Sequence, residues 1–160
     1  MVFHTLSNFD IENYMKHFKH FRGVFMNDEL PNAIENHESG IVNYENSNQG
    51  GSHWIAYDNH PDSKYVYYFC SYGLPPTIQL EKYLKSSGKL ILFNDTQLQP
   101  YGSNLCGYYC IMFIHFIESH HDGRPMSYLD FMSQFKANKF ENDQLIKSLT
   151  LKMFHVQKSI

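Results

Sequence analysis

The sequence has no long apolar run and no excess of basic residues. Every apolar stretch is shorter than the roughly 18 residues that a membrane-spanning helix needs. The first residues also lack the uninterrupted apolar stretch of a signal peptide. Thirteen Lys and Arg stand against 16 Asp and Glu, so the formal net charge is −3 with the ten His neutral. These absences argue against a membrane protein, a secreted protein and a module that binds nucleic acid through a basic field.

Cysteine is scarce as well, with only Cys70, Cys106 and Cys110 in the chain. An odd number, in a chain long enough to fold without covalent staples, indicates reduced thiols and an intracellular, reducing compartment. One of the three thiols is then available as a nucleophile.

The composition is that of a folded domain. Hydrophobic residues make up 42%, aromatic residues 16% and charged residues only 18%, which is enough apolar surface to form a core. At 160 residues and 18.9 kDa, residues 1–160 are expected to form one domain.

Short runs of aromatic and β-branched residues, bounded by turn formers, predict the strands of a small sheet. They lie at residues 53–57, 64–69 and 89–93, with a further strand or turn at 24–26. The connection over 58–63 has the length of a hairpin, so the first two strands are predicted to be antiparallel neighbours. Residues 43–52 are polar and contain glycine, which is typical of a loop.

Apolar periodicity predicts helices around this sheet. The first covers Ser7–His20, with His17 and His20 expected on its solvated face, and a short one follows Pro75 and Pro76. Two more are predicted near the end of the chain, opened by Ser127 or Asp130 and by Asn142 or Asp143. Residues 106–117 are apolar almost throughout, which favours a helix buried on most sides. The fold class is therefore α+β, a small, mainly antiparallel sheet packed against a buried helix.

Cys106 is the thiol best placed to act as a nucleophile. It follows the candidate cap residues Ser103 and Asn104 and opens the buried helix, whose unpaired N–H groups and dipole favour a thiolate. Its own N–H can donate to an oxyanion, and the small Gly107 lets a substrate carbonyl approach the backbone. The plainer interpretation of any cysteine is a small buried hydrophobe, which is the role expected of Cys110.

His53 and Gln99 are the candidate partners of Cys106. His53 opens a strand behind a Gly-Gly-Ser loop and before Trp54, which is where a general base must lie to take the proton of a thiol. Gln99, seven residues before Cys106, is a candidate second oxyanion donor, a role typically worth about 2–4 kcal/mol. Taken alone, each also fits an ordinary strand histidine or loop glutamine.

A metal site is not expected from the sequence. Cys106 and Cys110 could face one ion together with His115, His120 or His121. Their spacing is not that of a zinc knuckle or finger, however, and the stretch between them is apolar.

Three motifs together resemble one known family. They are Gly-Gly-Ser-His-Trp at 50–54, Tyr-Phe-Cys-Ser-Tyr-Gly at 68–73, and Gln99 ahead of Cys-Gly-Tyr-Tyr-Cys at 106–110. This order is similar to the adenovirus protease (adenain) family of adenovirus-like viruses and Maverick/Polinton elements, over roughly residues 23–118. Ulp-type SUMO proteases share the His-Trp, Tyr-Phe-Asp-Ser-x-Gly and Gln…Cys-Gly signatures and belong to the same wider clan. The Gly-Gly pair, the Cys-Gly-Tyr-Tyr-Cys helix start and the compact length favour the viral branch.

The resemblance implies a papain-like thiol endopeptidase with His53 as base, Cys106 as nucleophile and Gln99 as oxyanion donor. Substrate contacts would fall at Gly51, Trp54 and Gly107. The implied substrates are structural precursors of a virus or virus-like element, cut at sites with small residues, often glycine, by a monomer in the host nucleus or virion. No cofactor is required by the sequence, and activation by a viral peptide or DNA rests on the resemblance alone.

One position departs from the family pattern. The acid expected seventeen residues after His53 is replaced by Cys70, and a neutral thiol with an ordinary pKa near 8.5 is a poor partner for imidazolium. Three interpretations stay open: a weakened but active enzyme, an enzyme in which Asp58 or Asp95 orients His53, and a binding domain that has lost catalysis. A protease for SUMO-type modifiers is the alternative enzyme.

Overall fold

We describe a computed structural model of the chain, covering residues 1–121, 124–125 and 127–158. Its strands are β1 (Phe21–Phe25), β2 (Glu38–Asn43), β3 (Trp54–Asn59), β4 (Tyr65–Phe69), β5 (Leu90–Phe93), β6 (His120–His121) and β7 (Arg124–Pro125). Its helices are α1 (Asn8–Met15), α2 (Ile78–Lys85), α3 (Cys106–Glu118), α4 (Tyr128–Met132) and α5 (Lys139–Lys158).

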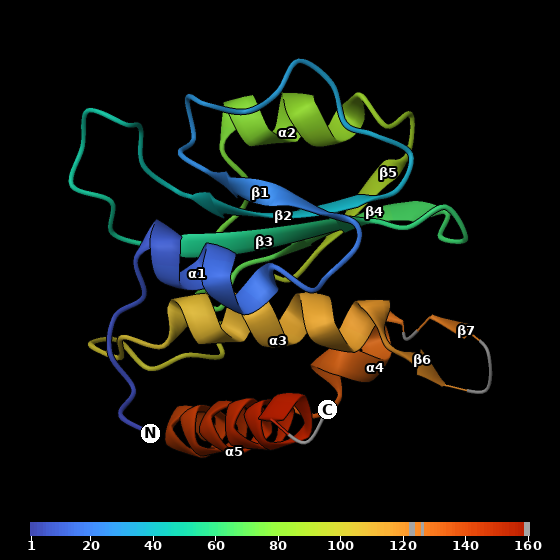
Figure 1. Ribbon diagram of the computed structural model, residues 1–160. Coiled ribbons are helices and arrows are strands. Elements are labelled where there is room, and N and C mark those ends of the chain that lie inside the picture. The colour runs from blue at the N-terminus through green and yellow to red at the C-terminus, as the bar shows by residue number, and fades with distance from the viewer. Residues whose placement is uncertain (122–123, 126, 159–160) are drawn as a thin grey trace.

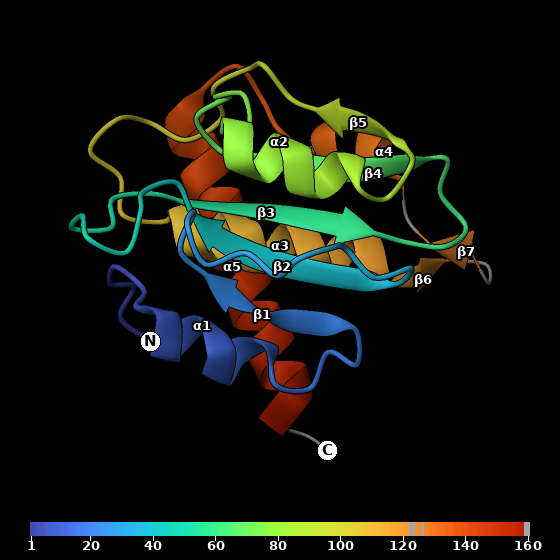
Figure 2. The same cartoon turned by 90° about the horizontal axis from the view of Figure 1, so that it is seen from above.

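The core is a five-stranded sheet in the order β1-β2-β3-β4-β5, while β6 and β7 form a separate ribbon. The helix α2 lies on one face of the sheet and α3 on the other, with α5 beyond α3 (Figure 1). Seen from above, α1 lies beside β1 at one edge (Figure 2). The layers confirm the α+β fold with a buried helix against a small sheet.

The central strand β3 is buried on both faces, as a strand with a helix on either side must be. Its side chains alternate between the two cores. Trp54 and Ala56 belong to the apolar cluster that includes α3, whereas Ile55 and Tyr57 belong to the cluster that includes α2. The even-numbered positions of β3 therefore face α3.

The strands predicted around 53–57, 64–69 and 89–93 are present, and the hairpin between β3 and β4 is antiparallel as expected. The sheet is nevertheless mixed. The pairs β2–β3 and β3–β4 are antiparallel, but each outer strand runs parallel to its neighbour. Helices α2 and α3 begin where the sequence predicts them.

The strand β2 has no counterpart in the sequence predictions. It begins with Glu-Ser-Gly, a polar start that is atypical of a buried strand, yet all six residues are buried. Glu38 is accommodated because Arg22 donates to it at 2.8 Å and Tyr57 at 2.5 Å. Gly40 is required by packing, since a Cβ there would lie 2.5 Å from the Tyr57 ring.

Two helix boundaries differ from those predicted. The first helix ends at Met15 because the chain turns there, with the N–H of Phe18 donating to the Met15 carbonyl. The sequence predicts His17 and His20 on the solvated face of this helix. That prediction is wrong, because both residues follow its end. The last helix begins at Lys139, ahead of the predicted start at Asn142 or Asp143.

The side chain that opens α5 is that of Asn138, which accepts from the N–H groups of Phe140 and Glu141. Asn142 is instead buried and donates to the carbonyls of Leu98 and Lys136. The predicted cap of α4 is confirmed, because Ser127 and Asp130 form a capping box. Among the described residues, no helix combines the length and apolar character needed to cross a membrane.

Candidate active site

Cys106 and His53 lie close together in the fold, at the same end of α3 and β3. Cys106 opens α3, and His53 immediately precedes β3. Both are buried, with Cys106 7% and His53 5% exposed. Tyr72 lies next to both, since its ring stacks on His53 with 4.5 Å between centroids, and burial, and then the nearby Cys106, raise the pKa of its phenol.

Cys106 forms part of a groove of about 390 Å³. The groove is also lined by Trp54 and Gly51, by the N-terminal segment 5–8 and by residues 24–26 at the end of β1. The predicted substrate contacts Gly51 and Trp54 thus lie on the same surface as the thiol. At Gly107 a Cβ would lie 3.0 Å from Leu6, so the small size of this residue admits the N-terminal segment.

The N-terminus of α3, where Cys106 lies, is not capped as predicted. Leu105 occupies the N-cap position, and neither Ser103 nor Asn104 caps the helix with its side chain. Burial raises the pKa of the Cys106 thiol, while the backbone N–H groups of Trp54, Gly107 and Cys106 itself act in the opposite direction. Burial outweighs the helix terminus here, so Cys106 is a thiol at neutral pH and the expected stabilised thiolate is not found.

His53 is also held in its neutral form. Burial lowers the pKa of its imidazole to about 4. Its Nε2 lies 3.2 Å from the Sγ of Cys70, and its Nδ1 is buried with no hydrogen-bond partner among the described residues. Nε2 is therefore oriented by Cys70, and Nδ1 is available to exchange a proton with a nucleophile or substrate.

Cys70, at the position of the expected acid, lies in a cradle of hydrogen-bond donors. Burial raises the pKa of its thiol, against the backbone N–H groups of Leu74, Tyr72 and Gly73, while the Tyr68 hydroxyl donates to the Leu74 carbonyl at 2.8 Å. Several backbone donors converging on one side chain form the kind of site that stabilises a carboxylate. The geometry around Cys70 thus fits the aspartate that the sequence lacks. All three cysteines are free thiols.

Gln99 is fully buried and fixed at both ends of its amide. Its Oε1 accepts from the hydroxyl of Ser71 at 2.6 Å, and its Nε2 donates to the Ser103 carbonyl at 2.9 Å. The Nε2 carries two hydrogens, so one remains after the bond to Ser103. Ser71 directly follows Cys70, which ties the glutamine to the same loop that contacts His53.

The alternative acids lie elsewhere. Asp58 is five residues along β3 from His53, about 16 Å away at the usual rise of a strand. Burial, and then the neighbouring Glu118, raise the pKa of Asp58 well above its ordinary range. Asp95 is exposed on the loop after β5, where Thr96 donates to its carboxylate at 3.5 Å. The hydrogen bond of His53 goes to Cys70 and to neither aspartate.

Tyr72 and the N-terminal segment belong to this site but were not predicted from the sequence. Tyr72 stands inside the Tyr-Phe-Cys-Ser-Tyr-Gly motif, so its place in that motif was an available signal for the ring that stacks on His53. The N-terminal segment carried no signal, yet the Leu6 carbonyl accepts from the Trp54 indole at 3.0 Å.

Cys110 is fully buried one turn beyond Cys106, as expected of a core residue. His115 lies elsewhere, at the other end of α3, and the side chains of His120 and His121 are outside the described residues.

The family model described as adenovirus endoprotease matches residues 19–158. No curated protein sequence matches the chain. Among solved structures, the ASFV pS273R protease is 18% identical with a TM-score of 0.48, covering 68% of this chain and 55% of that one.

A selenomethionine form of the same protease is 19% identical with a TM-score of 0.46, covering 67% of this chain and 43% of that one. The chain thus spans about half the length of these solved structures. Since the family model covers most of the sequence, the chain belongs to the adenovirus endoprotease family of cysteine proteases.

Proposed function

We propose that this chain is an active cysteine endopeptidase in which Cys106 attacks the peptide bond and His53 moves the proton. One observation carries the proposal: His53 contacts residue 70 through Nε2, while its Nδ1 is buried with no hydrogen-bond partner in the described part of the chain, at the end of the sheet where α3 begins with Cys106. A general base must keep one nitrogen for the nucleophile while the other is oriented by a third group.

The resting pair is neutral, because burial raises the pKa of Cys106 and lowers that of His53. Proton transfer then accompanies attack. The Cys106 sulfur bonds to the substrate carbonyl carbon as its proton passes to His53. The N–H of Cys106 and the remaining Nε2 hydrogen of Gln99 stabilise the oxyanion.

His53 then gives its proton to the leaving amine, which leaves a thioester on Cys106. Water attacks the thioester with His53 again taking a proton. The acid product departs and the thiol regains its hydrogen, so the enzyme returns to its starting state.

Cys70 weakens this machinery without removing it. A thiol in the donor cradle can orient the imidazole through the 3.2 Å contact, but it supplies little of the negative charge that would stabilise imidazolium. A Cys–His pair depends less on its third member than a serine enzyme does, because a thiol is intrinsically the more acidic and nucleophilic group.

The substrate is a polypeptide extended along the groove beside Cys106. Trp54 and Gly51 line this groove, and a large aromatic ring beside the thiol favours small residues such as glycine next to the cut. Structural precursors of a virus or virus-like element are the substrates proposed, by analogy with the family.

The test is cleavage of peptides containing Gly-Gly or Gly-Ala by the full chain, with C106A as the control. Cleavage by the parent and none by C106A is expected. Cleavage that persists in C106A would overturn the assignment. A binding domain without catalysis would show no cleavage by the parent and recovery only in C70D. Capture of a SUMO vinyl sulfone at Cys106, with no peptide cleavage, would favour the modifier protease.

A further inference from the structure

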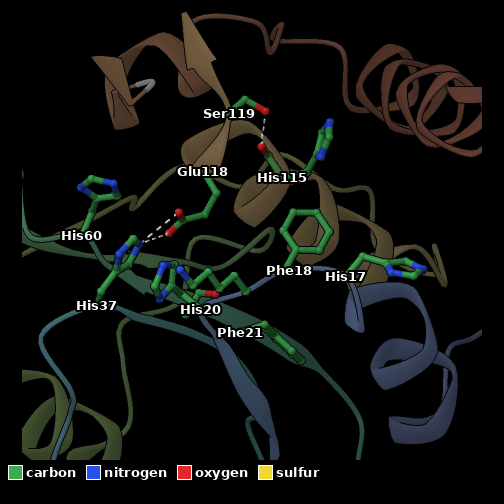
Figure 3. Close-up of a pocket in the computed structure, with 11 residues that line it drawn as sticks. His17, Phe18, His20, Phe21, His37, His60, His115, Glu118 and Ser119 are labelled. Carbon is green, nitrogen blue, oxygen red and sulfur yellow. Dashed lines mark hydrogen bonds and ion pairs between the residues drawn. The ribbon is translucent and has the colours of Figure 1, made fainter. Parts of the chain in front are cut away.

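A second cluster of reactive side chains lies at the opposite end of β3 and α3 from Cys106. His37 precedes β2, His60 follows β3 and Glu118 is the last residue of α3. One ligand atom from each, a ring nitrogen or a carboxylate oxygen, lies within 4.8 Å of the others. In Figure 3 the imidazole of His37 faces the Glu118 carboxylate, with His60 beside them.

The contacts within the cluster are close. The Nε2 of His37 lies 3.2 Å from both carboxylate oxygens of Glu118, and the rings of His37 and His60 are 4.6 Å apart. His20 stacks on the other side of His37, with 3.5 Å between centroids. The N–H of Asp62 donates to the Nδ1 of His60 at 3.1 Å, and the Asp62 carboxylate lies 3.9 Å from the same nitrogen. The stacking holds the rings of His20 and His37 together. The bond from Asp62 occupies the Nδ1 lone pair of His60, so a metal ion that binds the neutral ring must displace this bond.

The sheet adds three buried oxygens beside this cluster. Ser39 and Asp58 are direct cross-strand partners, so their side chains lie on the same face of the sheet, the one that packs against α3. Ser39 is 1% and Asp58 0% exposed, and neither the hydroxyl of Ser39 nor either carboxylate oxygen of Asp58 has a hydrogen-bond partner among the described residues. Ser39 lines the same cavity as His37 and Glu118, and the Glu118 carboxyl is the group beside Asp58.

A buried carboxyl group without donors, such as that of Asp58, is costly in its charged form unless it is paired with a cation. Two carboxyl groups side by side, with two imidazoles within reach, gain that pairing from a divalent ion. Mg²⁺ and Ca²⁺ prefer oxygen ligands alone, whereas two histidines and one carboxylate form a characteristic zinc ligand set. A cavity of about 630 Å³ adjoins the cluster and leaves room for a water as the fourth ligand.

We propose that His37, His60 and Glu118 bind one zinc ion, with Asp58 and Ser39 as the buried oxygens behind the ligands. This site is separate from the thiol groove, since Glu118 is about 18 Å from Cys106 along the helix axis. It joins three segments that are distant in the sequence, the entry to β2, the exit of β3 and the C-terminal end of α3. Bound zinc therefore fixes the helix that carries the nucleophile against the sheet.

The experiment measures zinc binding by the full chain carrying C106A, because the active-site thiol is itself a potential zinc ligand. Isothermal titration with zinc sulfate, with metal analysis after gel filtration, is expected to give one zinc per chain. In the same background, H37Q, H60Q and E118Q are each expected to weaken binding at least tenfold. H17Q is the matched control, because His17 lines the same cavity but is exposed and outside the ligand set, and it should bind as the C106A chain does.

Folding of each variant is checked by circular dichroism, and if E118Q does not fold, H37Q and H60Q decide. No stoichiometric zinc in the folded C106A chain would overturn the proposal, as would binding that H37Q and H60Q leave unchanged. Magnesium binding as tight as zinc binding would also contradict it, because it would indicate an oxygen-only site. Cobalt added in place of zinc should give a visible spectrum without thiolate-to-metal charge transfer, and the presence of that band would assign the metal to the cysteines instead.

Discussion

The strand β3 and the helix α3 run together through the core, with a group of titratable side chains that includes histidine at each end. At one end, His53 and Cys106 are buried, and no carboxylate of the described residues is bonded to either of them. At the other end, His37 and His60 surround Glu118, with Asp58 buried behind it. The carboxylates that a catalytic histidine needs are present in the molecule, but about 16 Å further along the strand.

This difference teaches that the pKa of a buried histidine depends on its immediate partner. His53 contacts a thiol, and burial alone sets the direction of its pKa shift, down to about 4. A carboxylate at residue 70 would oppose that shift because an opposite charge favours imidazolium. The predictions below test whether the first end works as a catalytic site and how far the missing acid limits it.

The largest expected effect is that of removing the nucleophile. C106A should lower kcat/KM for peptide cleavage by at least about 10³-fold, because no other group forms the thioester. Steady-state kinetics on a fluorogenic peptide measures this loss. C110A is the matched control, since Cys110 is a core thiol one turn away, and it should retain cleavage with reduced stability. Loss of activity in C110A with retention in C106A would reverse the assignment.

Removal of the oxyanion donor should come next. Q99A is expected to lower kcat about 10²-fold with little change in KM, because Gln99 would stabilise charge that develops only in the transition state. Q97A serves as the comparison, since Gln97 donates only to the Gln99 carbonyl in the same loop. Equal effects of the two substitutions on kcat would indicate that Gln99 has a structural role only.

The restored acid should raise activity. C70D is expected to increase kcat/KM at neutral pH about tenfold or more, because the donor cradle around residue 70 suits a carboxylate that stabilises imidazolium. C70S tests whether charge or size is responsible, and it should not exceed the parent. A C70D chain that folds but cleaves no faster than the parent would show that the cradle does not serve catalysis.

The last prediction concerns stability in acid rather than a rate of cleavage. The pKa of His53 is lowered to about 4 in the folded chain, against about 6.5 when unfolded, so the unfolded state binds more protons between these values. Stability is therefore lost as the pH falls from 6.5 to 4, by an amount on the order of 3 kcal/mol at most.

H53Q should reduce this pH dependence, measured by urea unfolding at several pH values. Part of the dependence should remain, because burial also lowers the pKa values of His20 and His115. An unchanged dependence in H53Q would mean that His53 is not the group responsible.

Much of the fold was predictable because the relevant signals are local. Runs such as Tyr65–Phe69 and the apolar stretch after Cys106 contain their own periodicity and length, and both elements appear where expected. The strand β2 was not predictable, because Glu38 and Gly40 are explained only by Arg22 and Tyr57, which come from other elements. The early end of α1 likewise depends on a turn rather than on any helix-breaking residue.

The candidate site divides in the same way. The order of the motifs was enough to identify His53, Gln99 and Cys106 as candidate catalytic residues. It also showed that Cys70 occupies the position of the expected acid. The sequence could not show that burial would outweigh the helix terminus at Cys106, because the size of a desolvation effect depends on the surrounding packing. Nor could it bring His37, His60 and Glu118 together, since these residues meet only through the register of the sheet and the length of α3.

The central claim is that burial keeps Cys106 and His53 a neutral pair, because residue 70 is a thiol and supplies no carboxylate to oppose the effect of burial. The rate at which Cys106 reacts with iodoacetamide, followed by mass spectrometry from mildly acidic to alkaline pH in the parent and in C70D, tests it most directly. The claim predicts slow reaction at neutral pH that rises into the alkaline range in the parent, and a profile shifted to lower pH in C70D. Fast reaction of the parent at mildly acidic pH, or identical profiles in the two chains, would contradict it.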